Sequence, residues 1–180
     1  NGRAELISEF AFRLPVIVIC EMLGIPRADH EQFFSSARTG GRLLDPVPLS
    51  REELDAANQQ NLAMAEYFSG LFQLRRRQPA DDLITLLVQA EQDGHRLTTE
   101  ELTGNIVLLF GAGHETTVNL IGNGLLALHR NPDQLALLRK EPERITNAVE
   151  ELLRYDSSVQ VTGRVALEDV DLGGTTIPKG

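Results

Sequence analysis

The stretch Gly111-Ala112-Gly113-His114-Glu115-Thr116-Thr117 lies in the middle of the most apolar part of the chain, although it carries a carboxylate and two hydroxyl groups. Thr98, with Glu101 three residues later, matches a helix-capping box, and Asn131-Pro132 would stop a helix. These signals predict one helix over residues 99–129, about 31 residues and roughly 46 Å long. Its apolar side chains fall on nearly every side, so we expect it to be buried nearly all round.

A membrane span would also explain a long apolar helix. A central acidic residue costs about 2.5 to 3.5 kcal/mol on insertion scales, and several polar residues interrupt the run. We therefore reject the membrane interpretation. The interrupting residues are His114, Glu115, Thr116, Thr117, Asn119 and Asn123.

The glycines and polar groups of this helix need a reason, because each glycine costs about 0.8 to 1 kcal/mol relative to Ala in a helix interior. Ala112 and Gly113 lie one turn before Thr116, whose hydroxyl can bond back to the Ala112 carbonyl. Such a shallow shelf with one polar group suits a flat apolar ligand. Glu115 points elsewhere, and a buried carboxylate needs a partner or a water chain, so proton delivery is one role for it. A simpler interpretation stays open: Gly113 allows close helix packing, Thr116 bonds back, and Glu115 reaches a cation in the core.

The rest of the chain reads as helical, with a change of period near its end. A second motif, Glu151 and Arg154, lies on the flank of a helix over residues 142–155, opposite its apolar stripe, and alone would be a solvated ion pair. After residue 156, β-branched Val159, Val161 and Val165, then Val170 with a Gly-Gly turn, predict short strands. We thus expect a mainly α chain, helical over 1–156, with strands and a turn over 157–180. The other predicted helices span 4–23, 28–39, 51–77, 82–91 and 132–140.

Composition excludes some functions. The chain of 180 residues has a net charge of −9 and is 42% hydrophobic, which argues against nucleic acid binding and is ordinary for a globular protein. The basic run Arg75-Arg76-Arg77 ends a predicted helix, where positive charge is favourable. Cys20, in an apolar helix, is most simply a buried free thiol.

Several segments together resemble one known family in their order and spacing. Residues 112–117 resemble the oxygen-activation motif in the long central helix of the cytochrome P450 haem-thiolate monooxygenases, and residues 151–154, Glu-Leu-Leu-Arg, resemble their Glu-x-x-Arg motif. Residues 161–166 are similar to the segment whose arginine meets a haem propionate, and residues 173–180 to the hairpin that follows. Residues 14–26 are similar to a helix common in soluble bacterial members. The resemblance covers the whole chain.

The resemblance implies the central part of the cytochrome P450 fold, mainly α with a short β hairpin near the C-terminus. It implies that Thr116 hydrogen-bonds the dioxygen being activated and that Glu115 relays protons. Ala112 and Gly113 would leave room for haem and oxygen, with Thr117 beside them in the cofactor site.

Further positions follow from the same resemblance. Arg164 would pair with a haem propionate, and Glu151 and Arg154 would hold the core around the haem loop. The family's iron ligand is a cysteine in a glycine-rich loop well downstream, which the chain does not reach, and Cys20 has no such loop around it. We therefore expect residues 1–180 to be one partial domain of a larger enzyme, truncated at both ends, holding no metal ligand, not competent alone, and exposing apolar surface if isolated.

The implied enzyme is a cytoplasmic monooxygenase that uses haem b and O2, with electrons ultimately from NAD(P)H, to hydroxylate or otherwise oxidise a small apolar substrate. Ferredoxin and ferredoxin reductase would be its electron donors, with neither nucleic acid nor membrane as a partner. Five apolar residues could meet substrate, although core packing explains them equally well: Phe33, Phe34, Leu43, Leu44 and Leu49. Two alternatives stay open: a haem-free truncated homologue or helper acting through protein contacts, and a helical bundle that binds haem through His114 or His129.

Overall fold

The computed structural model describes residues 2–40, 48–92 and 95–180 of the chain, which form seven α-helices and two small hairpins in those ranges. The α-helices are α1 (Arg13–Leu23), α2 (His30–Gly40), α3 (Arg51–Arg77), α4 (Leu83–Gln89), α5 (Thr99–Arg130), α6 (Pro132–Lys140) and α7 (Ile145–Tyr155). Short helical turns precede three of them: η1 (Ile7–Ala11), η2 (Arg27–Asp29) and η4 (Pro142–Arg144). The strands are β1 (Glu91–Gln92), β2 (His95–Arg96), β3 (Val170–Leu172) and β4 (Thr175–Ile177).

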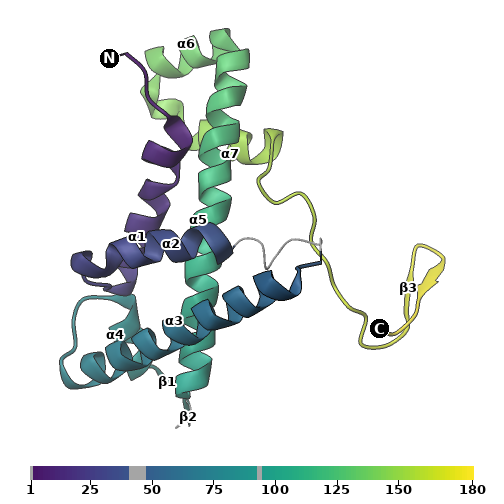
Figure 1. Ribbon diagram of the computed structural model, residues 1–180. Helices are drawn as coiled ribbons and strands as arrows, with labels where there is room; N and C mark the ends of the chain where they lie inside the picture. Colours follow the sequence, from purple (N-terminus) through teal and green to yellow (C-terminus); the bar gives the residue numbers. More distant parts are fainter. Residues whose placement is uncertain (1, 41–47, 93–94) are drawn as a thin grey trace.

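Helix α5 is the axis of the molecule. Figure 1 shows α2 and α3 crossing it and α1 lying beside it, with α6 and α7 folding back near its C-terminal end. Its start is fixed as predicted: the Glu101 backbone N–H donates to Thr98 Oγ1 at 3.2 Å, and the Thr98 N–H donates to the Glu101 carboxylate at 2.8 Å. The predicted long helix is therefore confirmed, at 32 residues.

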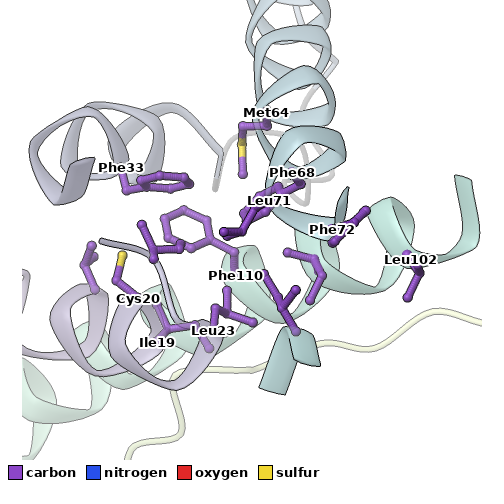
Figure 2. Close-up of a cluster of buried hydrophobic side chains, with 14 of the residues drawn as sticks. Ile19, Cys20, Leu23, Phe33, Met64, Phe68, Leu71, Phe72, Leu102 and Phe110 are labelled. Atoms are coloured by element: carbon purple, nitrogen blue, oxygen red, sulfur yellow. The ribbon is translucent and has the colours of Figure 1, made fainter. Parts of the chain in front are cut away.

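The core lies on one side of α5, where α1, α2, α3 and α4 meet. Figure 2 shows aromatic and aliphatic side chains of these helices interleaving around the ring of Phe110. On α5 the buried side chains recur every four residues, so they form a single stripe along the helix. That stripe is Leu102, Ile106, Phe110, His114 and Val118.

The expected exposed apolar surface is present, whereas one expectation about strands is wrong. Leu108 of α5 is 64% exposed, and Leu125 and Leu126 are 40% and 46% exposed, because the other described helices cover only one side of α5. Residues 159–165 form no strand, since no segment in the described ranges pairs with them, and Val161 is 85% exposed. β-propensity reflects packing and pairing, and here neither is available.

The predicted C-terminal hairpin is confirmed. β3 and β4 pair antiparallel, with Val170 opposite Ile177, around glycines at φ +59° and +84°. The Gly180 backbone N–H donates to the Ala166 carbonyl at 2.9 Å and closes the base of this unit. Figure 1 shows the hairpin at the end of an extended segment that leads away from the helices.

One further finding concerns membranes. In the parts of the chain that the structure describes, no helix combines the length and the hydropathy that crossing a bilayer would require.

Candidate functional site

The stretch 111–117 sits in the middle of α5, with one face on the core and the other uncovered by the described helices. Ala112, Gly113 and Thr117 are exposed, whereas His114 is buried at 2%. An added Cβ on Gly111 would meet no heavy atom within 4 Å, and one on Gly113 would lie 3.6 Å from Ile19 Cδ1, an ordinary contact. Close packing between the described helices therefore does not require either glycine.

Both threonines bond back to their own helix. Thr116 Oγ1 donates to the Ala112 carbonyl at 3.0 Å, as predicted, and Thr117 Oγ1 donates to the Gly113 carbonyl at 3.1 Å. The two hydroxyls thus form a polar notch beside bare backbone. We call the surface of Ala112, Gly113, Thr116 and Thr117 the threonine notch.

Glu115 lies next to this notch and is half-buried. Among the residues whose side chains the structure describes, no cation and no donor contacts its carboxylate. The simpler interpretation, in which Glu115 reaches a cation in the core, is therefore wrong for this part of the chain. The carboxylate keeps partial access to solvent.

His114 is committed to hydrogen bonds within the protein. Its Nδ1 lies 2.8 Å from the Phe110 carbonyl of α5, and its Nε2 lies 3.1 Å from the Ala37 carbonyl of α2. Neither nitrogen is open to an iron ion, so the structure contradicts His114 as a haem ligand. Across the described ranges, no three His, Cys, Asp or Glu side chains are grouped so that they could hold a metal ion.

Glu151 and Arg154 form the predicted i, i+3 pair on α7. The guanidinium donates from Nε at 2.8 Å and from Nη2 at 2.6 Å to the two carboxylate oxygens. The hydrogen bonds from Arg154 lower the pKa of Glu151, and those to Glu151 raise the pKa of Arg154. Both side chains are exposed, so the pair presents an intact bidentate unit at the surface of the described chain.

The contact that holds α7 on α5 lies nearby. Gly124 of α5 is buried against Leu152 of α7, and an added Cβ there would come within 2.9 Å of Leu152 Cδ1. Asn123 Nδ2 donates to the Asp156 carbonyl at 3.3 Å, just after α7 ends.

Arg164 is not brought to the threonine notch in this structure. It lies on the exposed segment that leads away from α5 in Figure 1, and its Nη1 donates to the neighbouring Gly163 carbonyl at 2.7 Å. The propionate role of Arg164 therefore stays a prediction.

The apolar candidates for substrate contact divide in the same way. Phe33 and Phe34 are buried at 2% and 8%, and Phe33 packs on Phe110, so core packing accounts for both in this chain. Leu49 is half-buried. Leu43 and Leu44 lie outside the described residues.

Cys20 is fully buried in the core, as expected, and burial raises the pKa of its thiol to about 12. A metal ligand must be a thiolate, which this environment disfavours. Cys20 is therefore a packing residue.

Sequence reasoning missed a polar cluster that fixes the end of α1. Arg75 ion-pairs with Asp82, and its Nη2 donates to the Gly24 carbonyl at 2.8 Å. Asp82 also accepts the Thr85 N–H at 2.7 Å as the N-terminal cap of α4. Burial alone would raise the pKa of Asp82, but the bonds from Thr85 and Arg75 bring it below its ordinary value. The cap could have been found from the sequence, because Asp82 precedes an apolar run. The role of Arg75 could not, because its partners are 7 and 51 residues away and it was expected only as a charge at a helix end.

Known proteins match this arrangement. A family model, Cytochrome P450, matches residues 51–180. The vitamin D(3) 25-hydroxylase of Pseudonocardia autotrophica is 45% identical, over 100% of this chain and 43% of the relative. The biotin biosynthesis cytochrome P450 of Bacillus subtilis is 43% identical, over 99% of this chain and 45% of the relative.

Solved structures agree with the relatives. The crystal structure of P450BioI in complex with acyl carrier protein ligated with hexadec-9Z-enoic acid has a TM-score of 0.91 at 43% identity, covering 98% of this chain and 45% of that one. CYP109E1 from Bacillus megaterium in complex with testosterone has a TM-score of 0.86 at 34% identity, covering 97% and 46%. The chain spans less than half the length of each of these proteins, and over that span it belongs to the cytochrome P450 family.

Proposed function

We propose that the full-length protein is a haem-dependent monooxygenase and that this chain supplies its oxygen-activation helix. The observation that supports this best is the threonine notch, in which two hydroxyls lie beside exposed backbone on an otherwise apolar face of α5. Such a surface suits a planar apolar cofactor that carries a small polar ligand. Membership of the cytochrome P450 family makes haem the cofactor to expect.

Haem fits the residues that this chain offers, apart from the iron ligand. A planar ring can approach α5 closely at Ala112 and Gly113, which are exposed, with Thr117 beside them. Arg164 is exposed, and among the described residues its guanidinium contacts only the Gly163 carbonyl, so it is available to a propionate. Cys20 cannot serve as the ligand, so we propose that the thiolate comes from a part of the protein outside these 180 residues.

When bound, haem supplies the binding and reductive activation of dioxygen. Thr116 contributes its hydroxyl proton. In the structure this hydroxyl donates to the Ala112 carbonyl, with 3.0 Å between the two oxygen atoms. Rotation about the C–O bond of Thr116 would redirect that proton to a ligand in the threonine notch. Glu115, half-buried beside it, can take up a proton from solvent and restore the hydroxyl through water, which is the work of a general acid.

Glu151 and Arg154 have a structural role in this proposal. Their bidentate pair is already formed and faces outward from α7. Planar, bidentate guanidinium–carboxylate pairs give geometric specificity, so this pair would orient chain that packs against α7 in the full-length protein.

The substrate we propose is a small apolar molecule. One relative is a vitamin D(3) 25-hydroxylase. The related solved structures contain testosterone and a hexadec-9Z-enoic acid carried on acyl carrier protein, and all three molecules are largely apolar. Electrons would come from NAD(P)H through a ferredoxin reductase and a ferredoxin, and the enzyme would work in the cytoplasm.

Oxygen incorporation tests this function. The full-length protein, supplied with NADPH, ferredoxin reductase, ferredoxin and a panel of steroids and fatty acids under isotopically heavy dioxygen, should form a product that carries one heavy oxygen atom. Omission of ferredoxin is the matched control. A product whose added oxygen comes from water, or turnover that does not need the ferredoxin, would contradict the proposal.

A further inference from the structure

Two of the described contacts between α2 and α5 lie one turn apart on each helix. The ring of Phe33 packs edge-on against the ring of Phe110, with centroids 5.2 Å apart, and Figure 2 shows these two rings next to each other. One turn further along both helices, His114 Nε2 lies 3.1 Å from the Ala37 carbonyl oxygen. The first contact is apolar and non-directional, whereas the second is polar and fixes register.

The chemistry of this polar contact restricts the ring. Both neighbours of the imidazole are backbone carbonyls, Phe110 at 2.8 Å and Ala37 at 3.1 Å, and a carbonyl only accepts hydrogen bonds. A ring nitrogen that faces such a carbonyl can bond to it only as an N–H donor, so the two nitrogens have distinct partners, one on each helix.

The surroundings make loss of the bond to α2 expensive. His114 is 2% exposed, and its ring lies between the aromatic rings of Phe12, at 6.4 Å, and Phe110, at 5.4 Å. Water cannot replace a partner in such a place, and a buried polar group without a partner costs free energy.

The place of Ala37 in α2 gives the contact its structural meaning. Ala37 lies in α2 four residues after Phe33, so its carbonyl and the Phe33 ring meet α5 on successive turns. A side-chain hydrogen bond to this carbonyl ties α2 to α5. The residue that makes it, His114, is 77 residues away in the sequence.

We propose that His114 is a positioning residue, whose Nε2 bonds to the Ala37 carbonyl and so holds this turn of α2 against the threonine notch segment of α5. The residue directly precedes Glu115 and Thr116, so the same turn of α5 that carries the proposed oxygen-activating groups also holds α2 in place. This assignment needs neither haem nor turnover to be true.

Two isosteric variants separate the bonds of the ring. In His114→Gln the side-chain amide nitrogen can reach the place of Nε2 and keep the bond to α2, whereas in His114→Asn it reaches only the place of Nδ1 and keeps the bond within α5. Both replacements are uncharged amides at the same buried position, so both remove the ring and differ in which nitrogen position they can reach. The matched control is Thr103→Val, which removes a bond from Thr103 Oγ1 to the Thr99 carbonyl within α5 at 2.7 Å.

Hydrogen exchange of the full-length protein measures the effect. Amides in peptides from α2 should exchange about 2- to 12-fold faster in His114→Asn, because the net free energy of one hydrogen bond corresponds to that factor. In His114→Gln the exchange rates should stay within about twofold of the wild type. Peptides from α3 report whether each variant is folded and should not change. Thr103→Val should leave α2 exchange unaltered.

Equal acceleration of α2 exchange in His114→Gln and His114→Asn would overturn the proposal, as would unchanged exchange in both. Faster exchange in α2 and α3 alike would also overturn it, since the ring would then be a general core residue. A full-length protein that fails to bind haem would refute the proposed monooxygenase and leave this exchange test intact.

Discussion

At the scale of single residues, the hydroxyl of Thr116 carries the functional proposal. Thr116 Oγ1 donates to the Ala112 carbonyl oxygen at 3.0 Å, a hydrogen bond between residues one turn apart. Because the bond is local, the hydroxyl is in place before any cofactor arrives, and pre-positioned donors are what electrostatic catalysis requires.

Replacing Thr116 should separate electron use from product formation. In the full-length protein, Thr116→Val removes the hydroxyl and keeps the side-chain shape, so product per NADPH consumed should fall several-fold while peroxide rises. Thr116→Ser keeps a hydroxyl able to bond to Ala112 and should restore most of the coupling. The measurement is the ratio of product to NADPH with a peroxide assay, and unchanged coupling in Thr116→Val would remove Thr116 from the mechanism.

Glu115 is predicted to act on rate rather than on binding. Glu115→Gln removes the carboxylate that exchanges protons with solvent and keeps its size, so turnover should fall by about 10²-fold, the lower end for a positioned general acid or base. Substrate affinity should stay within about twofold, because nothing in the proposal places Glu115 against substrate. Steady-state kcat and KM measure both, and a variant that changes KM alone would contradict the relay.

Asp82 makes the free energy of unfolding fall at acidic pH. Its folded pKa is lowered, so its contribution to the free energy of unfolding is complete above the unfolded value of about 3.9 and is lost as pH falls through the folded pKa. Asp82→Asn should destabilise the protein by about 3 kcal/mol at neutral pH, because it leaves the guanidinium of Arg75, which is 14% exposed, without its counterion. Denaturant unfolding should show the gap between wild type and variant closing toward pH 3 (about one unit below the unfolded value).

The control for this prediction is Asp55→Asn, which removes the partner of Arg51 in an exposed pair and should change stability by less than about 0.5 kcal/mol. A gap between wild type and Asp82→Asn that stays constant or widens on acidification would show that the Asp82 charge does not stabilise the fold.

At the scale of elements, Gly24 determines how α1 ends. It lies at φ +75°, donates its N–H to the carbonyls of Cys20 and Glu21, and receives Arg75 on its own carbonyl. An added Cβ would overlap the Asp82 side chain, which Arg75 and Thr85 already hold in place. The end of α1, the end of α3 and the start of α4 therefore meet at one position without a side chain.

Gly24→Ala should consequently cost at least about 3 kcal/mol of unfolding free energy, from the left-handed backbone and the displaced ion pair. Gly70→Ala is the matched control: Gly70 lies within α3, an added Cβ meets nothing within 4 Å, and alanine should stabilise the helix by about 0.5 to 1 kcal/mol. Thermal or denaturant unfolding of both variants measures the difference. Similar values for the two variants would contradict the steric role of Gly24.

Elements marked by local signals were predictable from the sequence. The bounds of α3 and α6 agree with those predicted, because a capping box starts the first and an Asn-Pro pair starts the second. Residue 91 was predicted to be helical but pairs with Arg96 in a hairpin, and residues 159–165 have strand propensity without a partner strand. Pairing depends on residues elsewhere, which local propensity does not describe.

The candidate site divides in the same way. The bond from Thr116 to Ala112 spans four residues and follows from helix geometry, so the sequence predicts it. The bond from His114 to Ala37 spans 77 residues and depends on how α2 crosses α5. Nothing in the spacing of residues 111–117 distinguishes a histidine that faces another helix from one that faces a ligand.

At the scale of the whole molecule, the side of α5 away from the core is the main unexplained surface of the described chain. Leu108, Leu125 and Leu126 are exposed there, and α7 adds Ile145 and Leu153. Burial of such side chains stabilises a protein by roughly 1.5 to 3 kcal/mol each, so a surface of this kind favours a covering partner. The chain spans 43% to 45% of these relatives, so we propose that haem and further parts of a full-length cytochrome P450 cover this surface.

The central claim is that the full-length protein holds haem against the threonine notch of α5 with a thiolate on the iron. The visible spectrum of its reduced carbonyl complex tests this most directly, since the Soret band is strongly red-shifted by thiolate ligation. We predict that red-shifted band for the full-length protein, and the same band in Cys20→Ala, because Cys20 is a buried packing residue. An imidazole-type spectrum would contradict the account in favour of a histidine-ligated bundle, and the absence of any Soret band would contradict it in favour of a haem-free helper.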